Sequence, residues 1–153
     1  RLRLYRGKSF KVISWIMDHP SWGPAARKAE IMRMPPTILR VDYLLSGFGM
    51  PQVVREWILG RFKDLIRARV PVENKSLEAM IAALNFLFLE RVGKELVKTH
   101  VAAYFCTQDV SMRKYIKEFR GKFEAALEES IGSLSPDEEA TLDDFFRAMT
   151  KAS

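Results

Sequence analysis

The side chains that most often carry catalysis are few in this chain and form no known catalytic arrangement. The only histidines are His19 and His100, and the only cysteine is Cys106. Neither histidine has a second ligand at zinc spacing, and Cys106 lies in an apolar run that predicts a small buried hydrophobe. We therefore expect a protein that is not an enzyme and that holds no metal and no cofactor.

Acidic side chains gather toward the C-terminal end. Eight Asp and Glu and no Lys or Arg lie between Phe123 and Phe146. Adjacent pairs such as Asp143 and Asp144 point to different sides of a helix, which does not suit paired acid–base work. We interpret the segment as a solvated acidic face, with a docking site for the basic half of the chain as the alternative.

The cations are concentrated in the first half. Residues 1–71 carry 14 Lys and Arg against 5 Asp and Glu, a net charge of +9, whereas residues 72–153 carry 11 against 14, a net charge of −3. The hydrophobic fraction is nevertheless 48%, which excludes a generally disordered chain. A basic half on an apolar helical body suits an anionic partner: a membrane, an acidic glycoprotein or a nucleic acid.

Five of these cations form a basic N-terminal arm, which begins in residues 1–8 and continues to Lys11. They alternate with apolar and aromatic side chains, and such arms bind anionic membrane surfaces or nucleic acid phosphates. A solvated terminus is the equal alternative. The candidate anion-binding residues of the whole chain are Arg1, Arg3, Arg6, Lys8, Lys11, Arg27, Lys28, Arg33, Arg55, Arg61, Lys63, Arg67 and Arg69.

Large apolar side chains close to these cations are the second kind of candidate. Trp22 falls in an expected turn and Phe48 in a glycine loop, where both can be exposed. Exposed apolar groups beside arginines suit insertion into a membrane interface, although tryptophan is most often buried or half-buried. The candidates are Trp15, Trp22, Phe48, Met50 and Trp57.

The elements that position these residues are helices throughout, because apolar residues recur with i, i+3, i+4 spacing and no alternating β-branched run is present. We predict an all-α fold: one domain over 1–153, an up-and-down bundle of about five main helices, with a capped C-terminal helix in 132–153. Ser135-Pro136-Asp137-Glu138 is a strong helix start with a capping box. The expected helices begin near residues 9, 25, 37, 52, 77, 111 and 136, with Gly93 as a kink before a continuation to Cys106. Thr37 is the expected cap of a helix to about Ser46, and the helix after Pro51 is expected to run to Val70. The helix from Ser111 keeps its apolar register to Leu127.

The helix expected over Leu77–Val92, with Ser76 as its cap, is apolar nearly all round. Such a helix is either central in the bundle or covered by a partner, and a second copy of the chain is one such partner. Its longest uncharged run, Ala79 to Leu89, is shorter than the ~20 residues that span a bilayer. The chain begins on Arg1 rather than Met, so we expect a cut piece or a processed product; removal of a secretory or transit peptide is the usual processing.

Several short patterns, in order, resemble the abalone sperm lysin family of acrosomal proteins. They are Lys8-x-Phe10-x-Val12, Trp57-Ile58 in a basic helix, Pro71-Val72 at its end, and Leu77-x-Ala79-x-Ile81 opening the next. The resemblance covers roughly half the chain. It implies a compact, mostly five-helix bundle that is released from the acrosome and either dissolves the egg envelope without catalysis or promotes fusion of sperm and egg.

Departures from lysin itself favour the fusion-associated branch: more prolines before residue 52, an acidic C-terminal region and a more apolar Leu77–Val92. Our primary hypothesis is a secreted, acrosomal, non-enzymatic protein that binds anionic membranes at fertilisation and perturbs them to promote sperm–egg fusion. The first alternative is lysin-like adhesion to the egg-surface glycoprotein. The second is a helical, RNA-binding subunit of a ribonucleoprotein assembly, with nucleic acid ranked behind the other two partners.

Overall fold

The chain is all-helical wherever the structure, a computed structural model, describes it: residues 36–72 and 76–151. These residues form seven helices and no strand, which confirms the all-α class but gives more helices than the five main ones expected. The chain divides into two compact units, Arg1–Gly47 and Phe48–Ser153. Each unit is described here by itself.

The described part of the first unit is the helix α3, Pro36–Gly47. Pro36 occupies the first helical position, where the missing N–H costs nothing, and Gly47 ends the helix. The helix expected to about Ser46 is therefore confirmed, but the prediction of Thr37 as its cap is wrong, because Thr37 lies inside the helix. The helices expected before residue 35 and the basic arm at 1–8 lie outside the described residues.

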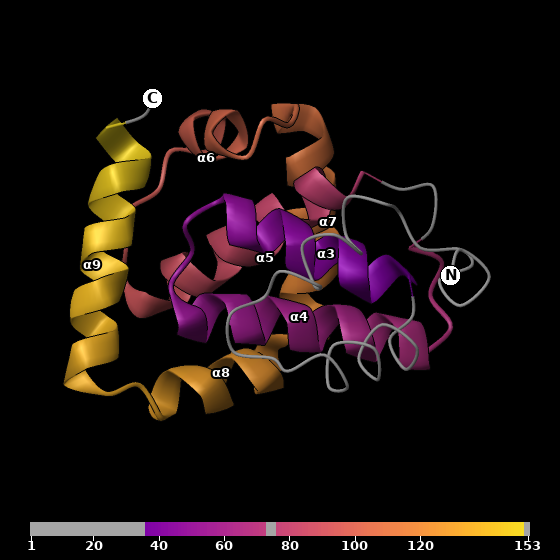
Figure 1. The fold of residues 1–153 in the computed structure, drawn as a ribbon, viewed down its shortest axis with the longest axis horizontal. Coiled ribbons are helices and arrows are strands. Elements are labelled where there is room, and N and C mark those ends of the chain that lie inside the picture. The colour runs from indigo at the N-terminus through magenta and orange to yellow at the C-terminus, as the bar shows by residue number, and fades with distance from the viewer. Residues whose placement is uncertain (1–35, 73–75, 152–153) are drawn as a thin grey trace, which may run out of the picture. The chain divides into compact units, whose positions relative to one another are not determined.

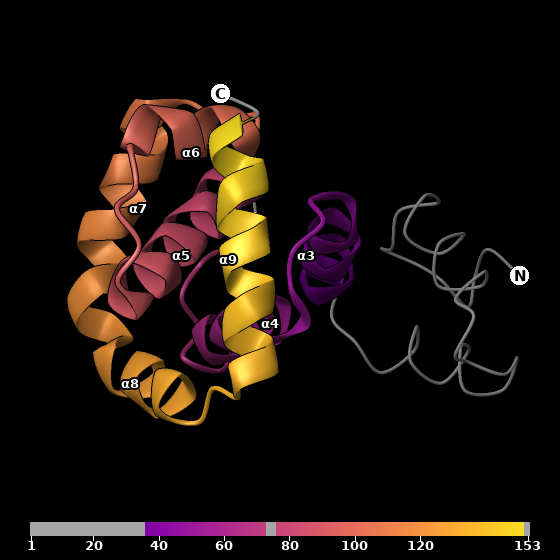
Figure 2. The same cartoon turned by 90° about the vertical axis from the view of Figure 1, so that its left-hand side faces the viewer.

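The second unit is built around α5, Leu77–Val92. Every residue from Ala79 to Leu89 is buried, which matches a helix that is apolar on all sides and settles its central position. Figure 2 shows α5 between α7 and α9, with α6 toward one end and α8 toward the other. The remaining helices of the unit are α4 (Gln52–Arg67), α6 (Lys98–Tyr104), α7 (Asp109–Lys122), α8 (Glu124–Gly132) and α9 (Pro136–Lys151) (Figure 1).

Local caps fix several helix ends as expected. The Ser76 hydroxyl accepts a hydrogen bond from the Ala79 N–H at 3.4 Å at the start of α5. At the start of α9, the Ser135 N–H donates to the Glu138 carboxylate at 2.9 Å, and the Glu138 N–H donates to the Ser135 hydroxyl at 3.2 Å. The predicted capping box is therefore confirmed in both directions.

Two helices end earlier than expected. Gly93 takes a left-handed conformation (φ 102°) and terminates α5, so the expected kink at this residue is wrong. The helix α4 stops at Arg67 instead of Val70, because Arg69 is also left-handed (φ 58°). There the Val70 N–H donates to the Leu65 carbonyl at 2.9 Å, the closing bond of a helix-terminating turn built without glycine.

One expected helix is two helices in the structure. The apolar register from Ser111 to Leu127 predicted a single element, but the chain turns at Phe123, which separates α7 from α8. Phe123 and Leu127 are both buried despite the turn. Periodicity alone missed this break, because the apolar spacing carries on through it. No proline marks the site, and Gly121 lies inside α7, two residues before the turn.

Candidate functional site

Five of the thirteen predicted anion-binding residues lie in the described residues, all on or just after α4. The other eight, from Arg1 to Arg33, lie outside them. Arg67 and Arg69 are exposed at the end of α4, and the Arg67 guanidinium lies 3.6 Å from the Asp64 carboxylate. Arg55 and Lys63 are half-buried. Of the five predicted cations that the structure describes, only Arg67 and Arg69 are therefore fully exposed to solvent.

Arg61 is occupied inside the unit. Its Nε lies 3.0 Å from the Asp64 carboxylate, and its side chain is only 16% exposed. The guanidinium carbon lies 5.4 Å from the ring centre of Trp57 and 6.0 Å from that of Phe123, both within cation–π range. Arg61 thus joins α4 to the α7–α8 turn, and we assign it a packing role in place of the expected membrane contact.

Trp57 is buried, with 5% of its surface exposed, so its prediction as an exposed apolar residue is wrong. Its ring packs on that of Phe88 in α5, with the ring centres 5.5 Å apart. One face of α4 is pressed onto the central helix, and Trp57 lies on that face together with Val54 and Ile58. Trp57 is therefore part of the core of the second unit.

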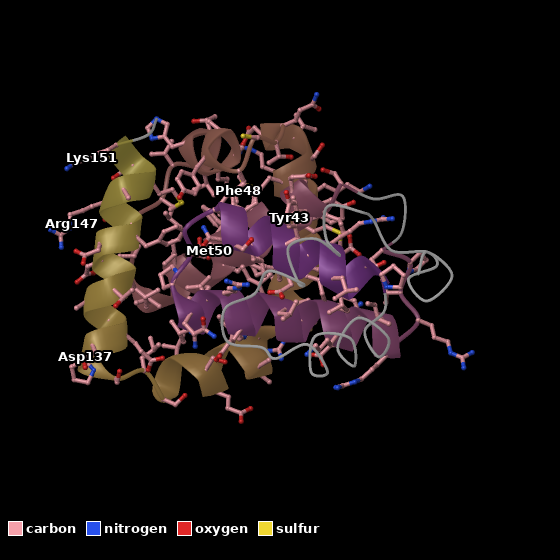
Figure 3. The ribbon with its side chains drawn as sticks, viewed as in Figure 1. Tyr43, Phe48, Met50, Asp137, Arg147 and Lys151 are labelled. Carbon is pink, nitrogen blue, oxygen red and sulfur yellow. The ribbon has the colours of Figure 1, made fainter. Side chains whose placement is uncertain are left out.

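Phe48 and Met50 are the two apolar candidates before α4, and both are labelled in Figure 3. Both side chains are half-buried. The Phe48 ring meets that of Phe105 edge to face, 4.8 Å between centres. The Tyr104 hydroxyl donates to the Phe48 carbonyl at 2.5 Å, and burial raises the pKa of this phenol above 10.0. The turn is therefore anchored to α6 by a ring contact and a hydrogen bond and does not project as a loose apolar loop.

The two remaining apolar candidates, Trp15 and Trp22, lie outside the described residues. Among the described residues, the large hydrophobic side chains with substantial exposure are Val97, at 52%, and Val110, at 77%. The sequence did not predict either residue as exposed. Val97 lies just before the short helix α6 and Val110 in the first turn of α7, where an apolar residue can equally well be buried.

Cys106 is exposed, so its expected burial is wrong. It follows α6 in a left-handed conformation (φ 55°), which turns its side chain away from the adjacent buried Phe105. The Cys106 N–H donates to the Ala103 carbonyl at 3.1 Å and so closes the end of the helix. The apolar run around Cys106 correctly indicated a segment with buried residues, but it did not indicate which residue of the run is exposed.

An open groove of about 510 Å³ lies between α5, α7 and α8 in the second unit. Leu87 and Leu127 line it together with charged side chains. The Arg120 guanidinium lies 2.6 Å from the Glu90 carboxylate, and Arg91 pairs with Glu128. Both arginines of the groove are therefore paired with carboxylates, and Glu124 is a further acid in the lining, so the groove offers no concentrated positive charge to a ligand.

The acidic segment is mostly exposed, and several of its carboxylates form ion pairs. Asp143 pairs with Lys94, and this hydrogen bond lowers the pKa of the Asp143 carboxyl. Asp144 lies 3.3 Å from Arg147 on the same helix. Figure 3 shows Asp137, Arg147 and Lys151 pointing outward along α9. This arrangement fits the solvated acidic face that we expected.

Sequence reasoning missed the cations of α7. Five Lys and Arg of this helix are exposed: Arg113, Lys114, Lys117, Arg120 and Lys122. The sequence did contain a signal for their exposure, because they occupy the polar positions of a strongly amphipathic helix. The predicted basic residues all lie in the first half of the chain, which has a net charge of +9, whereas α7 lies in the second half, which has a net charge of −3.

Over residues 36–72 and 76–151, no three His, Cys, Asp or Glu side chains come close enough to hold a metal ion. None of the helices described is both long and apolar enough to cross a bilayer. No protein-family model, no curated protein and no solved structure matches the chain.

Proposed function

We propose that this protein acts without catalysis by binding an anionic membrane through its basic N-terminal unit and disturbing the lipid packing. The observation that carries the proposal is how charge divides between the two compact units. Arg1–Gly47 contains nine Lys and Arg against three Asp and Glu, a net charge of +6, whereas Phe48–Ser153 contains sixteen of each and is neutral. The entire net charge of the chain therefore belongs to the first unit.

This division favours electrostatic capture by one part of the chain. Each Lys or Arg near an anionic lipid surface contributes about 1 kcal/mol, so the five cations from Arg1 to Lys11 would contribute about 5 kcal/mol. A neutral second unit adds no net repulsion to that attraction. The resemblance to acrosomal proteins supplies the proposed setting: secretion from the acrosome and promotion of sperm–egg fusion.

The test is leakage and lipid mixing of liposomes with the purified full chain, at low and at physiological salt. We expect activity on vesicles rich in phosphatidylserine and little on phosphatidylcholine vesicles, because the capture step depends on charge. Equal action on both lipids would refute the electrostatic step. No lipid effect at either salt would refute the proposal and leave binding to an egg-envelope glycoprotein, then to RNA, as the candidates to examine.

A pair of variants separates charge from other properties of the arm. In the first, the five cations of the arm are replaced by glutamine, which we expect to weaken binding to anionic vesicles by about 1,000-fold or more. In the second, each arginine becomes lysine and each lysine becomes arginine at the same positions, which keeps the charge and should keep most of the binding. Equal loss in both variants would show that net charge does not drive the contact.

A further inference from the structure

We propose that the exposed face of α7 is a second, rigid contact surface for anionic lipid membranes, with Val110 at its apolar end. This inference rests on the proposed function, since it names a further site for the same partner. It assigns a role to α7, which contains none of the predicted basic residues; those in the described part of the second unit lie on or just after α4.

The helix α7 is held firmly from one side. Met112, Tyr115, Ile116 and Phe119 are buried, and α7 makes its most extensive contact with the central helix α5. The rings of Tyr115 and Phe119 are stacked, with their centres 5.7 Å apart. A helix anchored in this way presents its opposite face in a fixed orientation, so little conformational entropy is lost when that face meets a partner.

The opposite face is a row of cations. Arg113, Lys117 and Arg120 lie three or four residues apart, as do Lys114 and Lys117, so they are neighbours on the surface of one helix. At 1.5 Å per residue, the 14 residues of α7 are about 21 Å long. The row is therefore long enough to contact several lipid headgroups at once.

Three of these cations have charge available for a partner. Lys114, Lys117 and Lys122 are exposed and form no ion pair with the residues that the structure describes. Arg113 and Arg120 differ, since their side chains lie 2.7 Å from Asp109 and 2.6 Å from Glu90. Lys114 and Lys117 in the row, together with Lys122 at the end of the helix, are thus the side chains that we expect to bind phosphate-bearing headgroups.

The exposure of Val110 favours a membrane over other polyanions as the partner of this face. It is 77% exposed, and it lies three, four and seven residues before Arg113, Lys114 and Lys117, on the same outer face. An apolar side chain beside cations gains by entering the boundary between headgroups and acyl chains, whereas it gains little on a nucleic acid backbone. The combination therefore favours a lipid surface.

Charge on the rest of the unit would orient this face. Asp109–Lys122 carries five Lys and Arg against two Asp and Glu, a net charge of +3, whereas residues 124–151 carry two against eight, a net charge of −6. Figures 1 and 2 agree that α7 and α9 lie on different sides of the second unit. An anionic surface would attract the α7 side and repel the α9 side.

The experiment measures binding of the full chain to phosphatidylserine vesicles by co-sedimentation at low salt. Replacing Lys114, Lys117 and Lys122 with glutamine should weaken binding about 100-fold, at about fivefold for each lysine. The matched control replaces Lys98, Arg147 and Lys151 with glutamine, which removes the same charge from α6 and α9 and should change binding less than threefold. All these side chains are at the surface or half-buried, and far-UV circular dichroism confirms that both variants stay folded.

A second pair of variants tests the apolar contact. Val110→Ser should weaken binding to vesicles severalfold, whereas Val97→Ser, at the other exposed valine, should leave it unchanged. Equal effects of the two triple variants would overturn the inference while the vesicle binding of the unaltered chain still upheld the proposed function. Failure of the unaltered chain to bind any anionic vesicle would overturn both. Binding that needs the lysines but not Val110, and that RNA competes away, would overturn the lipid assignment.

Discussion

Asn85 is the one polar side chain in the buried stretch of α5, and replacing it should stabilise the protein. It is 0% exposed, and its amide Nδ2 donates only to the Met149 sulfur in α9, at 3.6 Å. Thioether sulfur is a weak acceptor, and the amide oxygen Oδ1 has no hydrogen-bond partner among the described residues. The folded state therefore buries an amide that water would satisfy in the unfolded state.

The expected magnitude follows from that comparison. A buried polar group without a partner costs about 1–3 kcal/mol. Leucine has the same number of side-chain heavy atoms as asparagine and also branches at Cγ, although its two methyl groups are bulkier than the planar amide. A core substitution of this kind costs less than ~1.5 kcal/mol in strain. We expect Asn85→Leu to raise the free energy of unfolding by about 1–2 kcal/mol, which is roughly 2–8 °C in Tm for a chain of this size.

The assay is urea unfolding followed by far-UV circular dichroism, carried out as a double-mutant cycle with Met149→Leu. In the otherwise unaltered chain, Met149→Leu removes the sulfur that accepts from Asn85 and should cost about 1 kcal/mol. In the Asn85→Leu background the same change should be close to neutral, because no amide is left to satisfy.

Two results would refute this reasoning. If Asn85→Leu lowers the free energy of unfolding, the amide is satisfied in the folded state. If Met149→Leu has the same cost in both backgrounds, the two side chains are not coupled, and the contact between α5 and α9 depends on shape alone.

Three further outcomes are expected. Ser135→Ala and Glu138→Ala should each lower the free energy of unfolding by about 1 kcal/mol. The double variant should lose less than the sum of the two, because each side chain accepts a hydrogen bond from the other residue's N–H. Thermal unfolding of the three variants measures these differences. Tyr104→Phe should lower stability by about 1 kcal/mol at pH 7 through loss of the bond to Phe48. Burial raises the pKa of the folded Tyr104 phenol above 10.0, so its contribution to stability is fully present below pH 10 and is lost as pH rises through the folded pKa. Tyr104→Phe should therefore lose less stability than the unaltered chain over that pH range. An equal loss would mean that Tyr104 does not cause the loss of stability at high pH. Cys106 should react with a thiol reagent in the folded protein without denaturant, and reaction only on unfolding would mean that the side chain is covered.

Much of the fold could be predicted because its signals are local. Ser76 and the Ser135–Glu138 capping box mark the starts of α5 and α9 by bonds within four residues of sequence. The central position of α5 follows from its own composition, since a helix without a polar side must be covered on every side. Termination at Arg69 was not predictable in the same way, because a left-handed residue with a side chain has no sequence signal as strong as glycine's.

The candidate site was predicted less well. Of the described apolar candidates, Trp57 is buried, while Phe48 is half-buried beside Phe105. The exposed Val110 was overlooked, because a valine at the start of a helix resembles any other apolar position. The packing of Arg61 could not be predicted either, because its ring contacts Trp57 and Phe123 are 4 and 62 residues away in sequence.

By itself, the sequence determined the helical class, the main capped helix starts, the buried central helix and the concentration of positive charge in the first half, because each depends on composition or on residues close together in the chain. Only the tertiary structure decided where the charge divides between compact units, which apolar side chains reach solvent, and which cations are already engaged. Exposure and pairing depend on which distant segments pack against a residue. For Trp57, Arg61 and Val110, the packing of α4, α5 and α7 decides whether each side chain is buried, paired or exposed.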